Sequence, residues 1–227
     1  SSADLISNFS NIKEDIDKCW GAIKYAEKPR IHIFVATSTI HMNKKLKKSP
    51  VEIAKIVHEM VGYAHSLCID VEFSLEDASR TDYDFMCKII RIAIESGATT
   101  INIPDTVGYS QPEEFGKRIK SIFDNLGGII SKYGVTISCH CHDDLGNAVA
   151  NSLEAIKAGV TQVECTINGI GERAGNASLE EITMNLKTRK EYFNSYVGIN
   201  AVKIYETSQM VSKMTNLIIQ PNKAIVG

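Results

Sequence analysis

The sequence predicts an α/β fold in which parallel strands alternate with helices, and three observations support this prediction. Short runs rich in β-branched residues recur along the chain, with helical-period segments between them. Within these runs apolar and polar residues mostly alternate, so each predicted strand has one apolar and one polar face. The chain contains no GxGxxG, GxxxxGKS or GxxxxGKT motif, so the nucleotide fingerprints of open sheets are absent. Together these features favour a (β/α)8 TIM barrel over an open doubly wound sheet.

Five segments have the composition of buried strands. They are "IHIFVA" (31–36), "IDVEFS" (69–74), "TTINIP" (99–104), "VTISCH" (135–140) and "TQVECT" (161–166). Strands of an open sheet that is covered on both faces should be apolar almost throughout, and these segments are apolar on one face only. In a barrel the helices cover the apolar outer face, and the interior here would be rich in carboxylates, amides and imidazoles. Such groups are costly to bury unless they pair, hydrogen-bond or bind a metal.

The segments between the strands predict helices with recognisable ends. Ser49 with Pro50 and Glu52 forms one capping box, and Ser110 with Pro112 and Glu113 repeats the arrangement. Further helices are predicted over about 11–26, 82–95, 146–158, 178–190 and 200–213.

Composition excludes several function classes. The chain has 227 residues, a formal net charge of −2 and 23% charged residues, which gives no sign of a nucleic-acid surface. No apolar run reaches the roughly 18 residues of a membrane span, and the first residues lack the layout of a signal peptide. The six cysteines lie in apolar or strand-like segments, which indicates free thiols in a reducing compartment.

The stretch "VTISCHCH" places His140 and His142 on one face of a strand and Cys139 and Cys141 on the other. Residues on opposite faces cannot share one metal ion, so the thiols are expected to pack under helices. Both imidazoles are expected to enter the barrel at the carboxyl end of the strand, where such barrels have their active sites. Two imidazoles in this relation can bind a divalent cation if oxygen ligands come from other strands. The alternative is a pair of core histidines satisfied by hydrogen bonds.

The loop "INGIGERAGNAS" (167–178) follows the next predicted strand. Gly169 and Gly171 permit close backbone approach, and the amide oxygen of Asn176 suits a hard cation. The alternative is a flexible connecting loop.

Five motifs in this order carry a family resemblance. They are "IHIFVATSTIHM", "EFSLEDASRTD", "TTINIPDTVGY", "HCHDDLGNAVANSLEAIKAG" and "VECTINGIGERAGNASLEE". From about Arg30 to its end, the chain resembles the 2-isopropylmalate synthase family, one of the metal-dependent, acyl-CoA-condensing barrel enzymes. The resemblance implies an acyltransferase that condenses acetyl-CoA with 3-methyl-2-oxobutanoate to give 2-isopropylmalate and CoA in leucine biosynthesis.

The resemblance also implies roles for single residues. His140 and His142 would be metal ligands, and Asn176 would lie at or next to the metal. Glu76 and Thr106 would be catalytic, and the substrate pocket would be lined by His32, Ser74, Glu76 and Thr106. The loops around the site would include Gly146, Glu172 and Arg173. Pairing between a carboxylate and a guanidinium there would hold the metal ligands in place. The implied cofactors are Mg²⁺, Mn²⁺ or Zn²⁺, acetyl-CoA as co-substrate, and a monovalent cation.

One departure from the family pattern concerns the first strand, which carries a DxxRDGxQ-like motif that does not occur here. The aspartate of that motif binds the metal and its arginine stabilises the enolate. We therefore expect strands 1 and 2 of the barrel to be missing, and the visible strands to be 3 to 8 unless "VGINA" (197–201) is a strand. The isolated chain is expected to be inactive and to bind metal weakly, because one ligand and the arginine are absent. The expected domains are a partial catalytic barrel over 1–195 and a C-terminal helix with the start of a linker over 196–227, without the regulatory domain.

Alternatives remain for the substrate of the enzyme and for the class of protein. Homocitrate, citramalate or methylthioalkylmalate synthase would differ in the chain length of the oxo acid, and a degenerate barrel would serve as a noncatalytic scaffold. Small-molecule substrates and a homodimer of the full-length enzyme are expected, with no nucleic acid and no membrane. The expected location is the cytoplasm, or a plastid or mitochondrion for a eukaryotic parent. The lysines of "HMNKKLKKSP" could contact CoA phosphates, although a solvated helix approach is the simpler interpretation.

Overall fold

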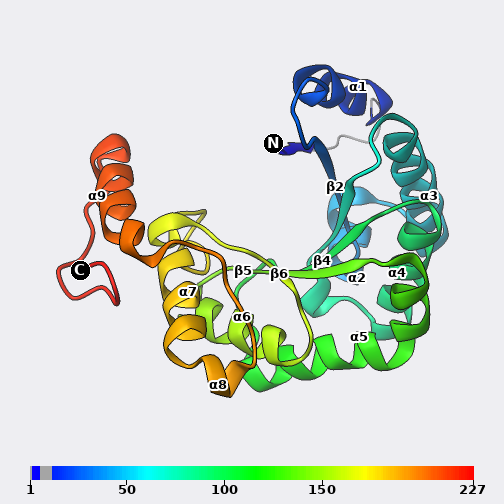
Figure 1. Cartoon of the computed structure of the whole chain (residues 1–227). Coiled ribbons are helices and arrows are strands. Elements are labelled where there is room, and N and C mark those ends of the chain that lie inside the picture. Colours follow the sequence, from blue (N-terminus) through cyan, green and yellow to red (C-terminus); the bar gives the residue numbers. More distant parts are fainter. Residues whose placement is uncertain (1, 6–11) are drawn as a thin grey trace.

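The computed structural model of this chain describes residues 2–5 and 12–227, and the predicted helix start at residue 11 lies outside them. Within these ranges, six strands form one parallel sheet in which each strand pairs with the next along the chain. They are β1 (Ser2–Leu5), β2 (Arg30–Ala36), β3 (Val71–Glu76), β4 (Thr100–Asp105), β5 (Thr136–Cys141) and β6 (Gln162–Glu164). Figure 1 shows the sheet bent into an open arc with helices along its outer side. In the described part of the chain β1 and β6 do not pair, so the sheet stays open and the predicted incomplete α/β barrel is confirmed.

The five predicted strands are all present, with bounds shifted by one residue in β2, β4 and β5 and by up to two residues in β3 and β6. β3 begins at Val71, and the side chain of Ile69 is 82% exposed, so its predicted place on the apolar strand face was wrong. β6 has only three residues. The sixth strand is β1, which no sequence pattern predicted, whereas "VGINA" contains no strand.

Helices connect the strands and cover the outer face of the sheet. The α-helices are α1 (Ile12–Ile23), α2 (Thr39–His41), α3 (Pro50–Leu67), α4 (Tyr83–Glu95), α5 (Pro112–Tyr133), α6 (Ala148–Lys157), α7 (Leu179–Thr188), α8 (Lys190–Phe193) and α9 (Ile204–Thr215). A π-helix, η1 (Met42–Leu46), follows α2, and the 3-10 helices are η2 (Ala78–Arg80), η3 (Ile167–Gly169) and η4 (Ala201–Lys203). No described helix is both long and apolar enough to cross a membrane.

Two helix starts show how the local sequence fixes the helices. Ser49 caps α3 as predicted, because its Oγ accepts from the Glu52 backbone N–H while Glu52 Oε2 accepts from the Ser49 N–H at 2.8 Å. The second predicted capping box was displaced by one residue. The cap of α5 is Gln111, whose backbone N–H donates to Glu114, instead of Ser110 with Glu113.

The core lies between the outer face of the sheet and the helices. Apolar side chains of the strands are fully or almost fully buried there, and they include Ile31, Ile33, Val71, Phe73, Leu75, Ile101, Ile103 and Ile137. Cys139 and Cys141 are completely buried in the same core, which confirms that the thiols pack under helices. The polar residues that alternate with them lie on the concave face.

Curvature of the sheet brings distant strands together on the concave side. Arg30 of β2 donates through Nη1 to Glu72 at 2.9 Å and to Gln162 Oε1 at 2.8 Å. Gln162 Nε2 in turn donates to Glu72 Oε1 at 2.8 Å. Side chains of β2, β3 and β6 therefore meet across the arc, and this polar network forms the floor beneath the candidate site.

Candidate active site

A cavity of about 570 Å³ opens on the concave side near the carboxyl ends of the strands. Its lining residues are His32, Phe34, Lys45, Ser74, Glu76, Asn102, Pro104, Thr106, His140, His142, Glu164, Gly171, Glu172 and Asn176. All seven residues that the sequence singled out for metal, substrate or catalysis are among them, and they come from β2, β3 and β5 and from the loops after β4, β5 and β6. The structure thus brings the candidate set into one space at the end of the sheet where barrel enzymes act.

The two histidines of β5 and its end face each other inside the cavity. His140 Nε2 and His142 Nε2 lie 3.0 Å apart, and the rings make an edge contact with an angle of 67° between their planes. Burial, the neighbouring His140 and the Arg173 guanidinium lower the pKa of His142 below its usual value. A neutral imidazole is the form that binds a metal ion, so this environment favours metal binding.

Asn176 completes this group from the loop after β6. The backbones of His142 and Asn176 form an antiparallel bridge, and the Asn176 Oδ1 atom is buried without a hydrogen-bond partner among the described residues. A Cβ at Gly171 would lie 2.7 Å from the Asn176 amide, so only glycine leaves room for it. Two imidazole nitrogens and an orphaned amide oxygen that line one cavity fit the donor set of a divalent cation.

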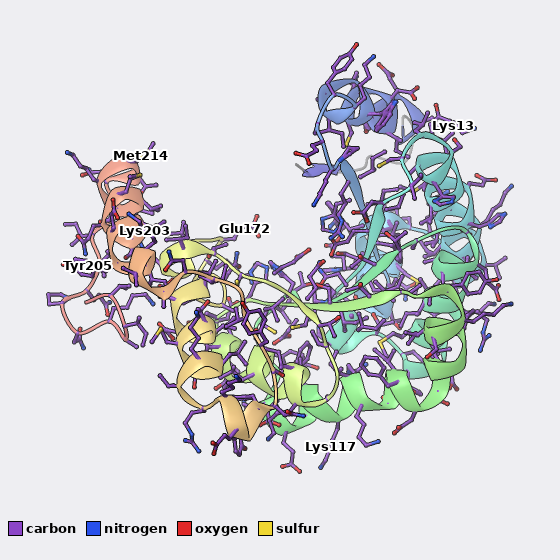
Figure 2. All side chains as sticks on the ribbon, in the orientation of Figure 1. Lys13, Lys117, Glu172, Lys203, Tyr205 and Met214 are labelled. Carbon is purple, nitrogen blue, oxygen red and sulfur yellow. The ribbon has the colours of Figure 1, made fainter. Side chains whose placement is uncertain are left out.

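The loop that carries Asn176 is held in place by a charged pair. Arg173 donates to both carboxylate oxygens of Asp144 at 2.8 Å and to the carbonyl oxygen of Thr106 at 2.8 Å. The predicted guanidinium–carboxylate pairing is therefore present, with Asp144 as the close partner, while the Glu172 carboxylate lies 3.7 Å from Arg173. Figure 2 shows Glu172 on this loop, at the open side of the arc.

Glu76 lies at the opposite wall of the cavity. Its Oε1 accepts from Lys45 Nζ at 2.7 Å, and His41 Nδ1 is 3.8 Å away. The π-helix η1 directs Lys45 toward the cavity, and Lys45 is the one cationic side chain among the cavity's described lining residues. Thr106 Oγ1 accepts from the Asp77 backbone N–H at 2.9 Å and so ties the ends of β3 and β4 together.

A short chain of hydrogen bonds joins the remaining pocket residues. His32 Nε2 and Ser74 Oγ are 2.7 Å apart, and Asn102 Nδ2 donates to the same Ser74 oxygen at 2.9 Å. Asn102 Oδ1 is buried and has no hydrogen-bond partner among the described residues, which leaves an acceptor available for a ligand.

Below the two histidines, Glu164 and Glu72 form the acidic floor of the cavity. Glu164 Oε2 lies 3.0 Å from His140 Nδ1. Burial and the charge of Glu164 raise the pKa of Glu72, whereas the His140 and His32 rings outweigh burial and lower the pKa of Glu164. The possible ligand atoms of His32, Glu72 and Glu164 lie within 4.8 Å of one another, so this cluster could also hold a metal ion.

Sequence reasoning did not assign three of these groups. Glu72 and Glu164 stood on the polar faces of predicted strands, but their pairing across the arc depends on its curvature. Lys45 was interpreted as solvated or as a contact for CoA phosphates, because nothing in its sequence predicts a π-helix. The regular i, i+2 spacing of polar residues was the available signal for both glutamates.

Comparisons with known proteins identify the family of the chain. A family model described as HMGL-like matches residues 2–211. The protein "2-isopropylmalate synthase 1" of Caldanaerobacter subterraneus subsp. tengcongensis is 56% identical over 216 residues, which cover 95% of this chain and 54% of that protein. The 2-isopropylmalate synthase of Ruminiclostridium cellulolyticum is 53% identical over 217 residues, covering 96% of this chain and 42% of that protein. The chain therefore spans about half the length of the curated relatives it matches.

Solved structures share the fold at low sequence identity. The HMG-CoA lyase of Bacillus subtilis superposes with a TM-score of 0.74 at 18% identity, over 98% of this chain and 72% of that one. An HMG-CoA lyase of Acinetobacter baumannii, in complex with coenzyme A and 3-methylmalate, gives a TM-score of 0.73 at 13% identity, over 99% of this chain and 82% of that one. With the family model covering most of the sequence, the chain belongs to the HMGL-like family.

Proposed function

We propose that this protein serves the condensation of acetyl-CoA with 3-methyl-2-oxobutanoate, which yields 2-isopropylmalate and CoA. The identity of 53–56% to proteins named 2-isopropylmalate synthase supports this choice of substrates. The observation that carries the proposal is the cavity in which His140 and His142 converge at 3.0 Å beside the orphaned oxygen of Asn176.

His140, His142 and Asn176 would hold the divalent ion, and Mg²⁺, Mn²⁺ and Zn²⁺ are the candidates. When bound, such an ion polarises the keto carbonyl of the oxo acid and stabilises the negative charge that develops on its oxygen. The residues of the chain bind and orient the substrate around this point. Asn102 and the Ser74 hydroxyl offer hydrogen bonds at the cavity wall, and Phe34 supplies an apolar surface for the branched end of the oxo acid.

The reaction removes a proton from the acetyl methyl group, joins that carbon to the keto carbon, and releases CoA as the thioester takes up water. Glu76 lies in the cavity with Lys45 2.7 Å from one carboxylate oxygen. A carboxylate in this position can accept the methyl proton or orient the group that accepts it. Thr106 fixes the neighbouring turn and lines the same wall.

The test uses ligand binding, because the sequence has no DxxRDGxQ-like stretch and the chain by itself is predicted not to turn over. Calorimetry of the 227-residue chain should detect 3-methyl-2-oxobutanoate binding that requires Mn²⁺. His142→Ala should abolish this binding, whereas His58→Ala, an exposed histidine on α3, should leave it unchanged. Metal-independent binding, or binding unaffected by His142→Ala, would contradict the proposal. A preference for 2-oxoglutarate or pyruvate would redirect the substrate assignment to homocitrate or citramalate synthesis.

A further inference from the structure

We propose that Glu164 is a positioning residue that turns the His140 ring so that its Nε2 atom presents a free electron pair to the cavity. The inference rests on the proposed metal-assisted function and extends it to a residue outside the ligand set. It concerns the orientation and tautomer of one imidazole.

The register of the sheet places the two residues directly beside each other. His140 of β5 and Glu164 of β6 are paired positions in neighbouring parallel strands, and both line the cavity. Glu164 Oε2 lies 3.0 Å from Nδ1 of His140, although the ring N–H does not point straight at the carboxylate. The opposite ring nitrogen, Nε2, lies 3.0 Å from His142 Nε2. The carboxylate and the proposed metal position are thus at opposite ends of one ring.

This arrangement selects a tautomer. A neutral imidazole carries a proton on one nitrogen only, and a carboxylate next to Nδ1 stabilises the form with the proton on that atom. The electron pair of Nε2 then points toward the cavity. Carboxylates in this relation to histidine ligands commonly orient the ring and raise the basicity of the metal-binding nitrogen.

His142 has no equivalent support. The Nδ1 atoms of both histidines are buried without a regular hydrogen bond among the described residues, but the described ion pairs place a carboxylate only beside that of His140. In the metal-free chain, His140 Nε2 would therefore accept a hydrogen bond, and His142 Nε2–H would donate it. His140 is the fixed member of the pair, and His142 must change tautomer when a metal ion binds both Nε2 atoms.

The floor network fixes Glu72, whose carboxylate lies within 4.8 Å of that of Glu164. Gln162, two residues earlier on β6, donates to Glu72 and also to Ser138 Oγ at 3.1 Å. Arg30 donates to the other oxygen of Glu72. Since both Glu72 oxygens already accept from cationic or amide donors, Glu72 is a poor ligand for a further cation. The floor carboxylate that contacts His140 is Glu164, with its Oε2 atom 3.0 Å from the Nδ1 atom of His140.

The first experiment observes the tautomer directly. In the ¹⁵N-histidine-labelled, metal-free 227-residue chain at pH 8, long-range ¹H–¹⁵N correlation spectra should show His140 with a protonated Nδ1 and His142 with a protonated Nε2. In Glu164→Gln the His140 signals should shift toward a mixture of tautomers, and Glu164→Asp should restore part of the wild-type pattern. A wild-type His140 with its proton on Nε2 would overturn the inference, whatever the metal affinity.

The second experiment measures Co²⁺ affinity by its visible absorption spectrum. Glu164→Gln should weaken Co²⁺ binding by about 10-fold to 100-fold, the range typical for loss of a carboxylate that supports a histidine ligand. The matched control is Glu154→Gln, which removes a carboxylate on the outer helix α6 that pairs with Lys157. Equal affinities of wild type and Glu164→Gln, with both folded by circular dichroism, would overturn the inference. A wild-type chain that binds no Co²⁺ at all would overturn the proposed function, and the tautomer measurement would still decide the role of Glu164.

Discussion

At the scale of single residues, the cavity is built from polar side chains that the strands direct to the concave face. His32, Ser74, His140 and His142 lie on polar strand faces, and each lines the same space. Asn176 lies outside the strand pattern, and its placement rested on the motif of loop 167–178 that carries the family resemblance. Roles were not predictable from alternation, because the same pattern gives His140, the proposed metal ligand, and Glu164, the proposed supporting carboxylate.

The place of Lys45 in the cavity could not be predicted from the alternation of polar and apolar residues. Lys45 lies within η1, a π-helix, and such helices shift side chains relative to an α-helix and are frequent at functional sites. Lysines in a run of charged residues are usually solvated, and the Lys45 side chain is 55% exposed even though its amine contacts Glu76. No composition or spacing rule separates it from its neighbours.

We predict that Lys45→Met weakens binding of the anionic oxo acid by about fivefold, because the cavity loses a cationic group while the partly exposed position limits the loss to about 1 kcal/mol. The measurement is calorimetric titration with 3-methyl-2-oxobutanoate in the presence of Mn²⁺. Lys44→Met is the matched control, since Lys44 is exposed and does not line the cavity. Equal losses of oxo-acid affinity in the two variants would mean that Lys45 contributes only through the general charge of the helix.

At the scale of elements, helices with clear end signals were located to within a few residues. α3 and α4 begin within one or two residues of the predicted start, because Ser49 and Asp82 cap them through side-chain oxygens. The start of α5 was shifted because two residues before Pro112 could each act as the cap. β1 and the short β6 were harder to predict, since edge strands gain most of their order from a neighbour that the local sequence does not reveal.

The cap of α3 gives a stability prediction. Ser49→Ala should lower the free energy of unfolding by about 1 kcal/mol, because the Glu52 backbone N–H loses its side-chain acceptor. Urea titration monitored by circular dichroism measures the difference. Ser131→Ala, an exposed serine within α5, is the control and should change stability by less than about 0.5 kcal/mol. If Ser49→Ala lowers the free energy of unfolding by no more than the control does, Glu52 alone maintains the start of α3.

At the scale of the whole molecule, the polar lumen predicted the barrel-like curvature, and the network of Arg30, Glu72 and Gln162 across the arc is its consequence. The open outline has two unpaired strand edges, β1 and β6, in the described part of the chain. The helix α9 stands apart from the sheet (Figure 1), and Figure 2 places Met214 at its far end. Met214 and Ile218 there are 80% and 91% exposed.

These edges and apolar side chains predict self-association of the purified chain, because unpaired strands and exposed apolar patches both favour contact with a second copy. Light scattering coupled to size-exclusion chromatography should give a mass above 25.0 kDa that rises with protein concentration. A mass that stays at that of the monomer at every concentration would show that the edges are protected.

The position of the bound metal tests the account most directly. In crystals of the chain soaked with Mn²⁺, the anomalous difference map should show one peak between His140 Nε2, His142 Nε2 and Asn176 Oδ1, at roughly 2.0–2.3 Å from each nitrogen and oxygen. A peak held instead by His32, Glu72 and Glu164, or no peak at saturating Mn²⁺, would contradict it.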